Sequence, residues 1–402
     1  MRLPESVARL VLLLLACAVG LVLAEGAARL LFAREFGDVL ALDDTLLYRP
    51  VPGAVKNHHL SAANGGGTVE VRFNSQGFRG PELRPAGSAP RVAVYGDSFI
   101  DGYFSAQPET FCARLERHLT AALGAPVEVI NAGVRGYGPD QIALKLAQEL
   151  PRLRPDLVVV AFYAGNDFGD VVRDQLFGLD ASGAIVRRAA RPADRYVEEF
   201  QSAQRGPFLL RAVSRIREAR ARAEPPFGIG ADSLNTLQVR RWLVDAEREY
   251  RTSLGAGDGR AAIFHDGEDA DIAIDPSSET AQHKVRLTAA VLRQLEAEVR
   301  AGGARLLYLL IPPPGDLIPG FDVYHIDARV FPGYSPAHLR EAALAVLQPG
   351  DAPVVDLYGP FTAAEPASLY LHADDMHWSP KGQDLAARLV ADSVRALGLL
   401  AR

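Results

Sequence analysis

The sequence predicts an α/β protein in which a doubly wound, five-stranded parallel sheet lies between two layers of helices. Short apolar runs alternate with helical patterns from residue 91 onward, which is typical of this class. Residues 157–163 form a continuous apolar run, as a central parallel strand buried on both faces requires. Ser379-Pro380 has the form of a helix N-cap followed by proline at the first helical position. The 402 residues suffice for one such domain with insertions, or for two domains.

The predicted elements follow in regular order on either side of one long interruption. Before it, we expect strands at 91–95, 127–130 and 157–163, with helices at 108–123 and 139–149. After it, an apolar stripe at 288–299 predicts a helix that leads to a strand at 305–311. Further on we expect a helix from Ser335-Pro336 to about 347, a strand at 353–357 and a final helix from 380 to about 397. If all the connections between successive strands have the same handedness, the five strands form one parallel sheet.

The interruption, at about 171–282, is interpreted as an insertion that shapes a substrate cleft. A basic amphipathic helix is expected at 207–223, either as a solvated face over a small core or on a membrane surface. The acidic stretch at 266–275 is expected to be a solvated loop. Residues 37–90 contain turn sequences and an alternating strand pattern at 68–73, and we expect them to pack on the main domain at 91–402.

The N-terminal segment, residues 1–36, contains an unbroken apolar run at 10–24 that follows Arg2 and Arg9. One interpretation is an uncleaved signal anchor that crosses the membrane once, with Arg9 reaching the interface. The other is a cleaved signal peptide, with small residues at 24–28 for the cut and secretion of the remainder. Arginines before the run favour a cytoplasmic N-terminus, so the rest would lie in the periplasm of a bacterium.

Charge and cysteine content argue against several classes of partner. The net charge is -6 and no basic tract is present, so nucleic acid is not an expected partner. The two cysteines, Cys17 and Cys112, lack neighbours at metal-ligand spacing, and a disulfide between them is not expected. We expect no metal and no cofactor.

Polar and glycine-rich loops follow the predicted strands and precede the final helix. They are Gly96-Asp97-Ser98, Asn131-Ala132-Gly133-Val134-Arg135-Gly136, Gly165-Asn166-Asp167 and Asp374-Asp375-Met376-His377. Because the carboxyl ends of parallel strands meet at one edge of a sheet, we expect these loops to lie together. A serine nucleophile needs a histidine base, a carboxylate that orients the histidine, and donors for the oxyanion. The loops contain a residue of each kind.

In sequence and order these four blocks resemble those of the SGNH hydrolases, the GDSL-type esterase and lipase superfamily. The resemblance covers residues 91 to about 402, apart from the insertion, and implies the flavodoxin-like SGNH fold. It implies that Ser98 is the nucleophile and His377 the base. Asp374, three residues before His377, is expected to orient the imidazole, with Asp375 as the alternative.

The resemblance also implies which groups would hold the oxyanion. They are the N–H of Ser98, the N–H of Gly136 and the amide of Asn166, with Gly133 as the alternative glycine. In the third block the family usually has Gly-x-Asn-Asp. Here Ala164 takes the place of that glycine and Gly165 the variable position, which leaves the local shape of the loop open.

Other residues near these blocks are given structural roles. Asp97 and Asp167 are expected to tie loops to backbone N–H groups. A metal site formed by His372, Asp374, Asp375 and His377 would leave Ser98 and Asn166 unexplained, so we expect His372 to be structural. Arg79, in a turn at 74–80, is expected to pack on the main domain, with ligand contact as the alternative.

The resemblance implies a serine esterase that hydrolyses an acyl or acetyl ester of the cell envelope or its surroundings. The membrane segment and the turn at 74–79 also resemble bacterial envelope members of the superfamily. The expected partners are a small-molecule or glycan ester and the inner membrane. The alternatives are an O-acetyltransferase or deacetylase of a cell-surface polysaccharide and a non-catalytic tethered scaffold. If His377 is the base, activity should rise through about pH 6–7.

Overall fold

The computed structural model describes residues 4–37, 39–198, 207–210, 231–255, 260–262, 267–321, 325–372 and 375–400. Within these residues the central sheet has five strands, and every neighbouring pair is parallel, so the predicted fold class is confirmed. In spatial order the strands are β13 (Val354–Asp356), β12 (Arg305–Ile311), β7 (Leu157–Tyr163), β5 (Arg91–Tyr95) and β6 (Glu128–Asn131). The order reverses between β5 and β7, and such a reversal is where open α/β sheets bind ligands.

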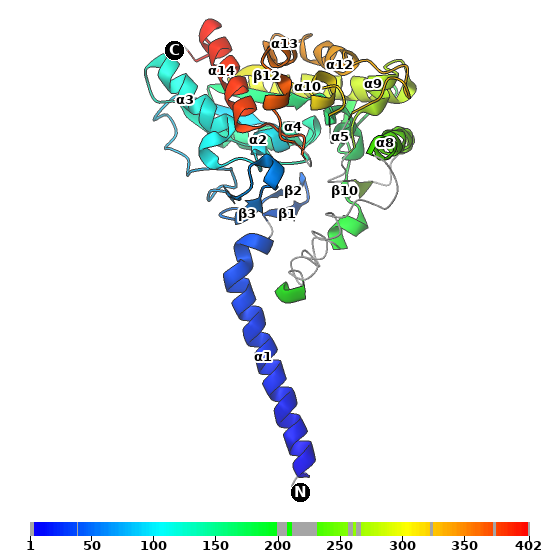
Figure 1. The fold of residues 1–402 in the computed structure, drawn as a ribbon. Helices are drawn as coiled ribbons and strands as arrows, with labels where there is room; N and C mark the ends of the chain where they lie inside the picture. Colours follow the sequence, from blue (N-terminus) through cyan, green and yellow to red (C-terminus); the bar gives the residue numbers. More distant parts are fainter. Residues whose placement is uncertain are drawn as a thin grey trace.

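Helices cover both faces of the sheet (Figure 1). On one face α3 (Phe111–Leu123) packs against α14 (Pro380–Ala396). On the other face α10 (Glu279–Ala301) packs against both α4 (Pro139–Leu153) and α12 (His338–Leu347). Alternate residues of β5 belong to the two cores: Val92 and Val94 face α3 and α14, whereas Ala93 and Tyr95 face α4 and α10. The sheet is therefore buried on both sides, and its loops alone reach solvent or ligand.

Side-chain caps fix where the main helices begin. As predicted, Ser379 caps α14 and accepts a hydrogen bond from the N–H of Gly382 at 3.2 Å. Ser278 caps α10 in the same way through the N–H of Ala281. The helix expected after Ser335 begins later, at His338, because the Ser335 hydroxyl accepts from the N–H of Ala337 in a turn before it.

The segment before the main sheet forms two antiparallel hairpins, and the expected strand at 68–73 is present. The strands are β1 (Leu40–Asp43) with β2 (Leu47–Pro50), and β3 (Val55–His59) with β4 (Thr68–Arg72). Arg79 joins this segment to the sheet, since its N–H donates to the Asn131 carbonyl at 3.2 Å. Its guanidinium donates to the carbonyls of Ser105, at 2.6 Å, and Asp101. Arg79 is 2% exposed and holds the loop that follows β5, so its observed contacts are structural.

The interrupting region contributes short strands and one long helix to the described part of the chain. The elements are α5 (Asp167–Arg173), β8 (Phe177–Leu179), β9 (Ile185–Arg187), β10 (Arg191–Pro192), α8 (Ala231–Leu254), β11 (Arg260–Ala261) and α9 (Ala270–Ile274). The expectation of a solvated acidic loop was wrong for Asp269 and Asp271, whereas Asp275 is exposed. Asp269 and Asp271 are buried because Lys284 of α10 donates to both carboxylates, at 2.8 and 2.7 Å.

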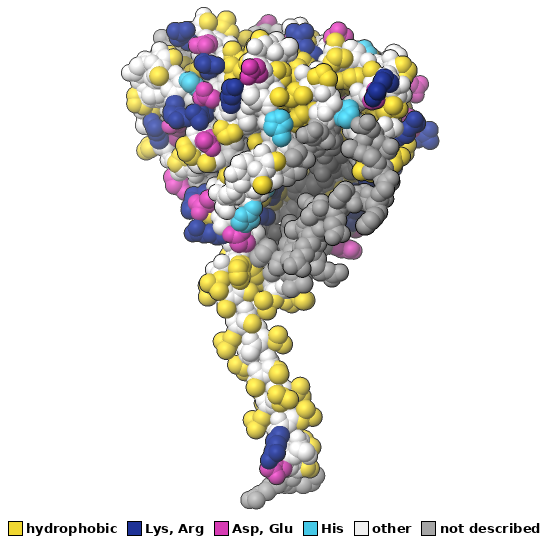
Figure 2. Space-filling model, viewed as in Figure 1, with side chains coloured by type: hydrophobic (Ala, Val, Ile, Leu, Met, Phe, Trp, Pro, Cys, Tyr) yellow, Lys and Arg dark blue, Asp and Glu magenta, His cyan; other side chains and the backbone are white. Residues whose placement is uncertain are grey.

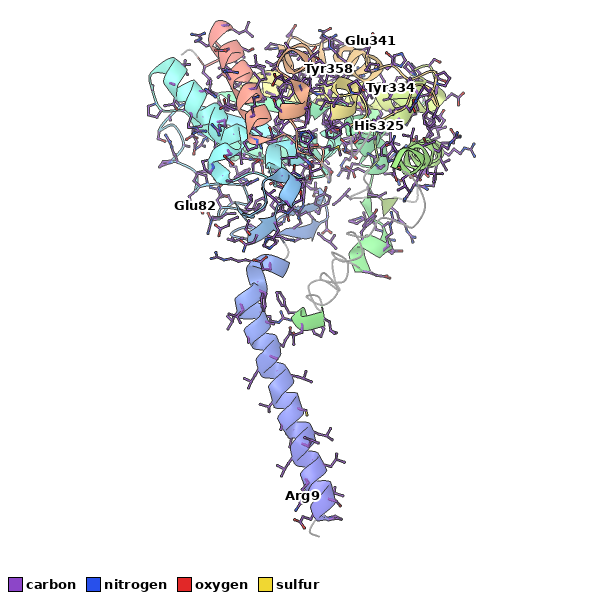
Figure 3. All side chains as sticks on the ribbon, in the orientation of Figure 1. Arg9, Glu82, His325, Tyr334, Glu341 and Tyr358 are labelled. Carbon is purple, nitrogen blue, oxygen red and sulfur yellow. The ribbon has the colours of Figure 1, made fainter. Side chains whose placement is uncertain are left out.

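The N-terminal helix, α1 (Glu5–Phe36), extends away from the globular part with an almost continuous apolar surface (Figures 1 and 2). Its stretch Glu5–Glu35 contains an 18-residue segment with a mean hydropathy of 2.7 and is long and apolar enough to cross a membrane, as signal sequences also are. Arg9 lies at the end remote from the globular part (Figure 3).

One short piece of the interrupting region reaches α1. Glu25 of α1 accepts hydrogen bonds from the N–H groups of Phe208 and Leu209, at 2.7 and 3.1 Å. The basic helix expected at 207–223 lies outside the described residues except for 207–210.

Candidate active site

A tight turn after β5 positions Ser98. Gly96 permits it, because a Cβ there would lie 2.5 Å from the Ile100 side chain. Asp97 accepts a hydrogen bond from the N–H of Phe99 at 2.9 Å and caps the short helix α2 (Ser98–Asp101), as expected for a structural aspartate. Ser98 is the first residue of α2, so its N–H has no acceptor within the helix.

The structure brings Ser98 and His377 together from opposite ends of the chain. The Nε2 atom of His377 lies 2.7 Å from Ser98 Oγ, and its Nδ1 atom lies 2.6 Å from Oδ1 of Asp375. An ionised carboxylate can only accept, so Nδ1 carries the proton and the serine hydroxyl donates to Nε2. These three side chains form a continuous hydrogen-bonded chain that ends at the serine oxygen.

The carboxylate in this chain belongs to Asp375 and not to Asp374, which lies outside the described residues. The sequence favoured Asp374 because it lies three residues before His377, with Asp375 as the alternative. In the structure the contact with the ring is made by Asp375. Asp375 Oδ1 also accepts from the backbone N–H of His377 at 2.8 Å. This turn, closed by an aspartate over two residues, aims the carboxylate back at the ring of His377.

Two aromatic rings hold the imidazole of His377. The ring centroid of Phe99 lies 4.9 Å from that of His377, and the centroid of Phe104 lies 4.8 Å from it. Sequence reasoning did not identify either residue. Phe99 directly follows Ser98, but nothing in the local pattern shows which distant ring it contacts.

The surroundings of His377 raise its pKa above the ordinary 6.5. Burial alone lowers the pKa of His377, since it disfavours the charged ring. The charge of Asp375, its hydrogen bond, and the charges of Asp97 and Asp101 outweigh burial. Burial also raises the pKa of Asp97 to about 6. The site therefore favours an imidazolium, the species that forms when a histidine takes a proton from serine.

A cavity of about 260 Å³ unites the remaining site residues that the sequence predicts. Ser98, Gly136, Asn166 and His377 all line it. Gly136 has φ 72°, a left-handed conformation that favours glycine. The N–H of Gly133, the alternative, donates to Asn131 Oδ1 at 3.1 Å, so it is already used. The geometry therefore favours Gly136 over Gly133 as the second oxyanion donor.

In the third block the glycine stands at residue 165, one position later than is usual in the family, and Asn166 still lines the cavity. A Cβ on Gly165 would lie 2.4 Å from Glu268 Oε2 and 2.6 Å from the ring of Tyr163. Asp167 accepts from the N–H of Tyr163 at 2.8 Å and ties the loop to β7. The loop thus requires glycine at residue 165, and the amide of Asn166 at the start of α5 still lines the cavity.

The described residues offer no group of three or more histidine, cysteine, aspartate or glutamate side chains that could hold a metal ion. His372 contacts the Ala367 carbonyl through Nε2 at 2.6 Å, so its ring stabilises the local backbone, as expected for a structural histidine. A second, much smaller cavity, of about 30 Å³, is lined by Tyr163, Glu268 and Asp316 among other residues. Asp316 accepts hydrogen bonds from Tyr334 and Tyr358, at 3.0 Å each. Figure 3 labels the two tyrosines.

Two family models match consecutive parts of the chain. Residues 94–256 match the GDSL-like lipase/acylhydrolase family. Residues 269–402 match the SGNH hydrolase-like domain of the acetyltransferase AlgX. The first match contains Ser98, Gly136 and Asn166, and the second contains Asp375 and His377. Each model therefore covers one side of the hydrogen-bonded chain.

Solved structures align over most of the chain at low similarity. A lipase/acylhydrolase from Enterococcus faecalis is 16% identical, with a TM-score of 0.36, and the alignment covers 77% of this chain and 96% of that one. The esterase EstA from Pseudoalteromonas sp. is 12% identical, with a TM-score of 0.35 and coverages of 76% and 97%. The lipase Lip_vut3 from a goat rumen metagenome is 11% identical, with a TM-score of 0.37 and coverages of 76% and 97%. Such scores carry no argument about activity. No curated protein matches the chain.

Proposed function

The chain belongs to the SGNH hydrolase superfamily, and from that premise we propose that it is a membrane-tethered serine esterase of the bacterial envelope. Hydrolysis of ester bonds is the activity of the matched acylhydrolase family. The observation that carries the proposal is the chain of contacts from Asp375 through His377 to Ser98, at 2.6 and 2.7 Å, which ends inside a cavity. A serine hydroxyl becomes a nucleophile when a base is in hydrogen-bond contact with it and a third group orients that base.

In the proposed reaction Ser98 Oγ attacks the ester carbonyl while its proton moves to Nε2 of His377. The carbonyl oxygen becomes an oxyanion and accepts hydrogen bonds from the N–H groups of Ser98 and Gly136 and the amide of Asn166. The imidazolium then gives its proton to the leaving alcohol, and the acyl group stays on Ser98. Water repeats the sequence: His377 removes its proton, the acid is released, and Ser98 recovers its hydrogen.

Asp375 acts through His377. Its carboxylate fixes the tautomer that leaves Nε2 free to accept a proton, and it stabilises the imidazolium. Phe99 and Phe104 restrict rotation of the ring. Asp375 also accepts a hydrogen bond from the backbone N–H of His377, and this bond holds the carboxylate beside the imidazole.

The tether places this chemistry at a membrane. We infer that α1 stays uncleaved, crosses the inner membrane once and leaves the enzyme domain in the periplasm. The apolar stretch of α1 and the arginine before it support this orientation. Protease treatment of intact spheroplasts tests it: the globular part should be digested from outside, and protection of that part would contradict the periplasmic location.

The activity is tested with the full chain in a neutral detergent and a series of p-nitrophenyl esters from acetate to palmitate. We expect hydrolysis of at least one ester, and covalent labelling of Ser98 by a fluorophosphonate identified by mass spectrometry. Folded protein that neither hydrolyses an ester nor takes the label would instead support a non-catalytic scaffold.

Acyl transfer is the second candidate, because residues 269–402 match a domain of an acetyltransferase. A sugar hydroxyl in place of water would attack the same acyl-serine, and His377 would remove its proton. The two activities are separated by supplying an acetyl donor with and without a polysaccharide acceptor. Acetylated glycan at the expense of free acetate supports the transferase, and acetate alone supports the esterase.

A further inference from the structure

The cavity at Ser98 also contains a cation that the ester chemistry does not use. Arg135 lies in the loop between β6 and α4, directly before Gly136, and is half-buried in the cavity wall. Its carbonyl accepts a hydrogen bond from the Tyr48 hydroxyl at 3.0 Å. Its Cζ atom lies 4.7 Å from the centroid of the Tyr103 ring, and this stacking restricts the side chain. Both the backbone and the guanidinium are therefore held in place.

Arg135 differs from the buried arginines of the core in that it forms no ion pair among the described residues, although its charge partly opposes the rise in the pKa of the buried Asp101. Arg91 pairs with Glu128 at 2.6 Å, and Arg173 pairs with Asp170 at 2.5 Å. Across the described ranges no carboxylate forms an ion pair with Arg135. Its guanidinium makes a cation–π contact with the ring of Tyr103. Removing a charge from water without pairing it costs free energy. An anion on a ligand would supply the missing partner.

Three acidic residues line the cavity, and none of them forms an ion pair with Arg135. Asp97 accepts a hydrogen bond from the N–H of Phe99 at 2.9 Å. Asp170 is committed to Arg173, and Asp174 shares a hydrogen bond with Asp140. Burial raises the pKa of Asp170 to about 7 and that of Asp174 well above its ordinary value. These carboxyls therefore carry less negative charge at neutral pH than their number implies, whereas a guanidinium stays charged.

We propose that Arg135 makes this enzyme selective for esters that also carry a carboxylate or phosphate group. The inference rests on the proposed ester chemistry and names a substrate class for the same cavity. A guanidinium binds either anion through two parallel hydrogen bonds, which gives both affinity and orientation. Because Arg135 and Ser98 line one cavity, the anion and the ester belong to one substrate molecule.

The first test compares three acetyl esters with the full chain in a neutral detergent. They are 4-acetoxybenzoate, 4-acetoxyphenyl phosphate and the uncharged methyl 4-acetoxybenzoate. Removal of the acetyl group releases a substituted phenol from each of them. Arg135→Met should lower kcat/KM for the anionic esters relative to the methyl ester by about 10- to 100-fold, mainly through KM. Arg135→Lys should retain part of the preference, since lysine keeps the positive charge but cannot donate two parallel hydrogen bonds to one anion. The two anionic esters separate a carboxylate from a phosphate preference.

The matched control is Arg300→Met, an exposed arginine on α10 that pairs with Asp351 at 3.4 Å. Ratios between esters should be the same for this variant and the unmodified protein. If the ratios also stay the same in Arg135→Met while hydrolysis still needs Ser98, the inference about Arg135 fails and the proposed esterase activity stands.

A binding measurement tests Arg135 without turnover. Calorimetry would compare 4-acetamidobenzoate with its methyl ester on the Ser98→Ala protein, since these amides replace the reactive ester. We expect tighter binding of the carboxylate, and loss of that difference when Arg135→Met is added. Equal binding of the two probes, or a difference that survives Arg135→Met, would overturn the inference whether or not any ester is hydrolysed.

Discussion

Two serine–histidine contacts of similar length occur among the described residues, and their surroundings differ. His377 lies 2.7 Å from Ser98 at the edge of the sheet, and His283 lies 2.9 Å from Ser253 between α8 and α10. Asp375 contacts the other ring nitrogen of His377 at 2.6 Å. Ser253, by contrast, donates its proton to the Tyr250 carbonyl at 2.7 Å, so it accepts from His283.

The same difference appears in the pKa values of the two rings. Burial, together with the charges of Arg286 and Arg188, lowers the pKa of His283 to about 4. The pKa of His377 is raised because Asp375 and two other carboxylates outweigh burial. A serine beside a histidine is thus a structural contact unless a carboxylate, a cavity and oxyanion donors accompany it.

The largest effect should come from the two serines themselves. Ser98→Ala should lower kcat/KM by about 10⁴- to 10⁶-fold, because it removes the oxygen that is in contact with the base. Ser253→Ala should leave kcat/KM within about 3-fold, since its hydrogen bonds go to Arg188, Tyr250 and His283, which do not line the cavity. Ester hydrolysis and fluorophosphonate labelling of both variants would measure this. Comparable losses in the two variants would mean that the contact at Ser98 is not the catalytic one.

The next effect concerns the two neighbouring aspartates. Asp375→Asn should lower kcat by about 10⁴-fold, because an amide favours the wrong tautomer of His377. Asp374→Asn should change kcat by less than about 3-fold. Steady-state kinetics with one ester would decide between them. The reverse order of effects would restore Asp374 as the orienting acid.

Loss of the Asn166 amide should have an intermediate effect. Asn166→Ala removes one donor to the oxyanion and should lower kcat by about 10²- to 10³-fold, with KM little changed because the oxyanion forms only in the transition state. The neighbouring loop should keep its shape, since Asp167 and Gly165 are unaltered. An increase in KM at constant kcat would show that Asn166 binds substrate instead.

The pH profile gives a smaller but more specific signal. The base must be neutral, so kcat/KM should fall as the pH drops through the pKa of His377. Because that pKa is raised, the midpoint should lie above 6.5 and not within or below the ordinary range. In Asp375→Asn the midpoint should move down, since the largest charge that raises the pKa is gone. A midpoint unmoved by this substitution would mean that another group titrates.

The smallest effect is on stability, at the structural pair. Ser253→Ala removes the acceptor of the His283 proton and the donor to the Tyr250 carbonyl in a buried site, so unfolding should become easier by about 1–3 kcal/mol. The exposed Ser88→Ala should change the free energy of unfolding by less than about 0.5 kcal/mol. Urea unfolding in detergent would compare the two. Equal stabilities would show that the pair at Ser253 contributes little.

Much of the fold could be predicted because its signals are local. The continuous apolar run of β7 and the serine cap of α14 depend on residues a few positions apart. The buried state of Asp269 and Asp271 could not be predicted in this way, because the lysine that neutralises them lies on another helix. Charged residues look solvated until a distant partner is known.

The candidate site divides along the same line. The sequence by itself determined that Ser98, Gly136, Asn166 and His377 follow strands or precede a capped helix, since each lies in a short motif. Only the tertiary structure decided that Asp375 contacts the ring, that Phe99 and Phe104 lie against it, and that Arg135 forms no ion pair with any described residue. The reason is physical: a motif is set by neighbours along the chain, whereas a hydrogen-bond partner or an unpaired charge is set by segments hundreds of residues apart.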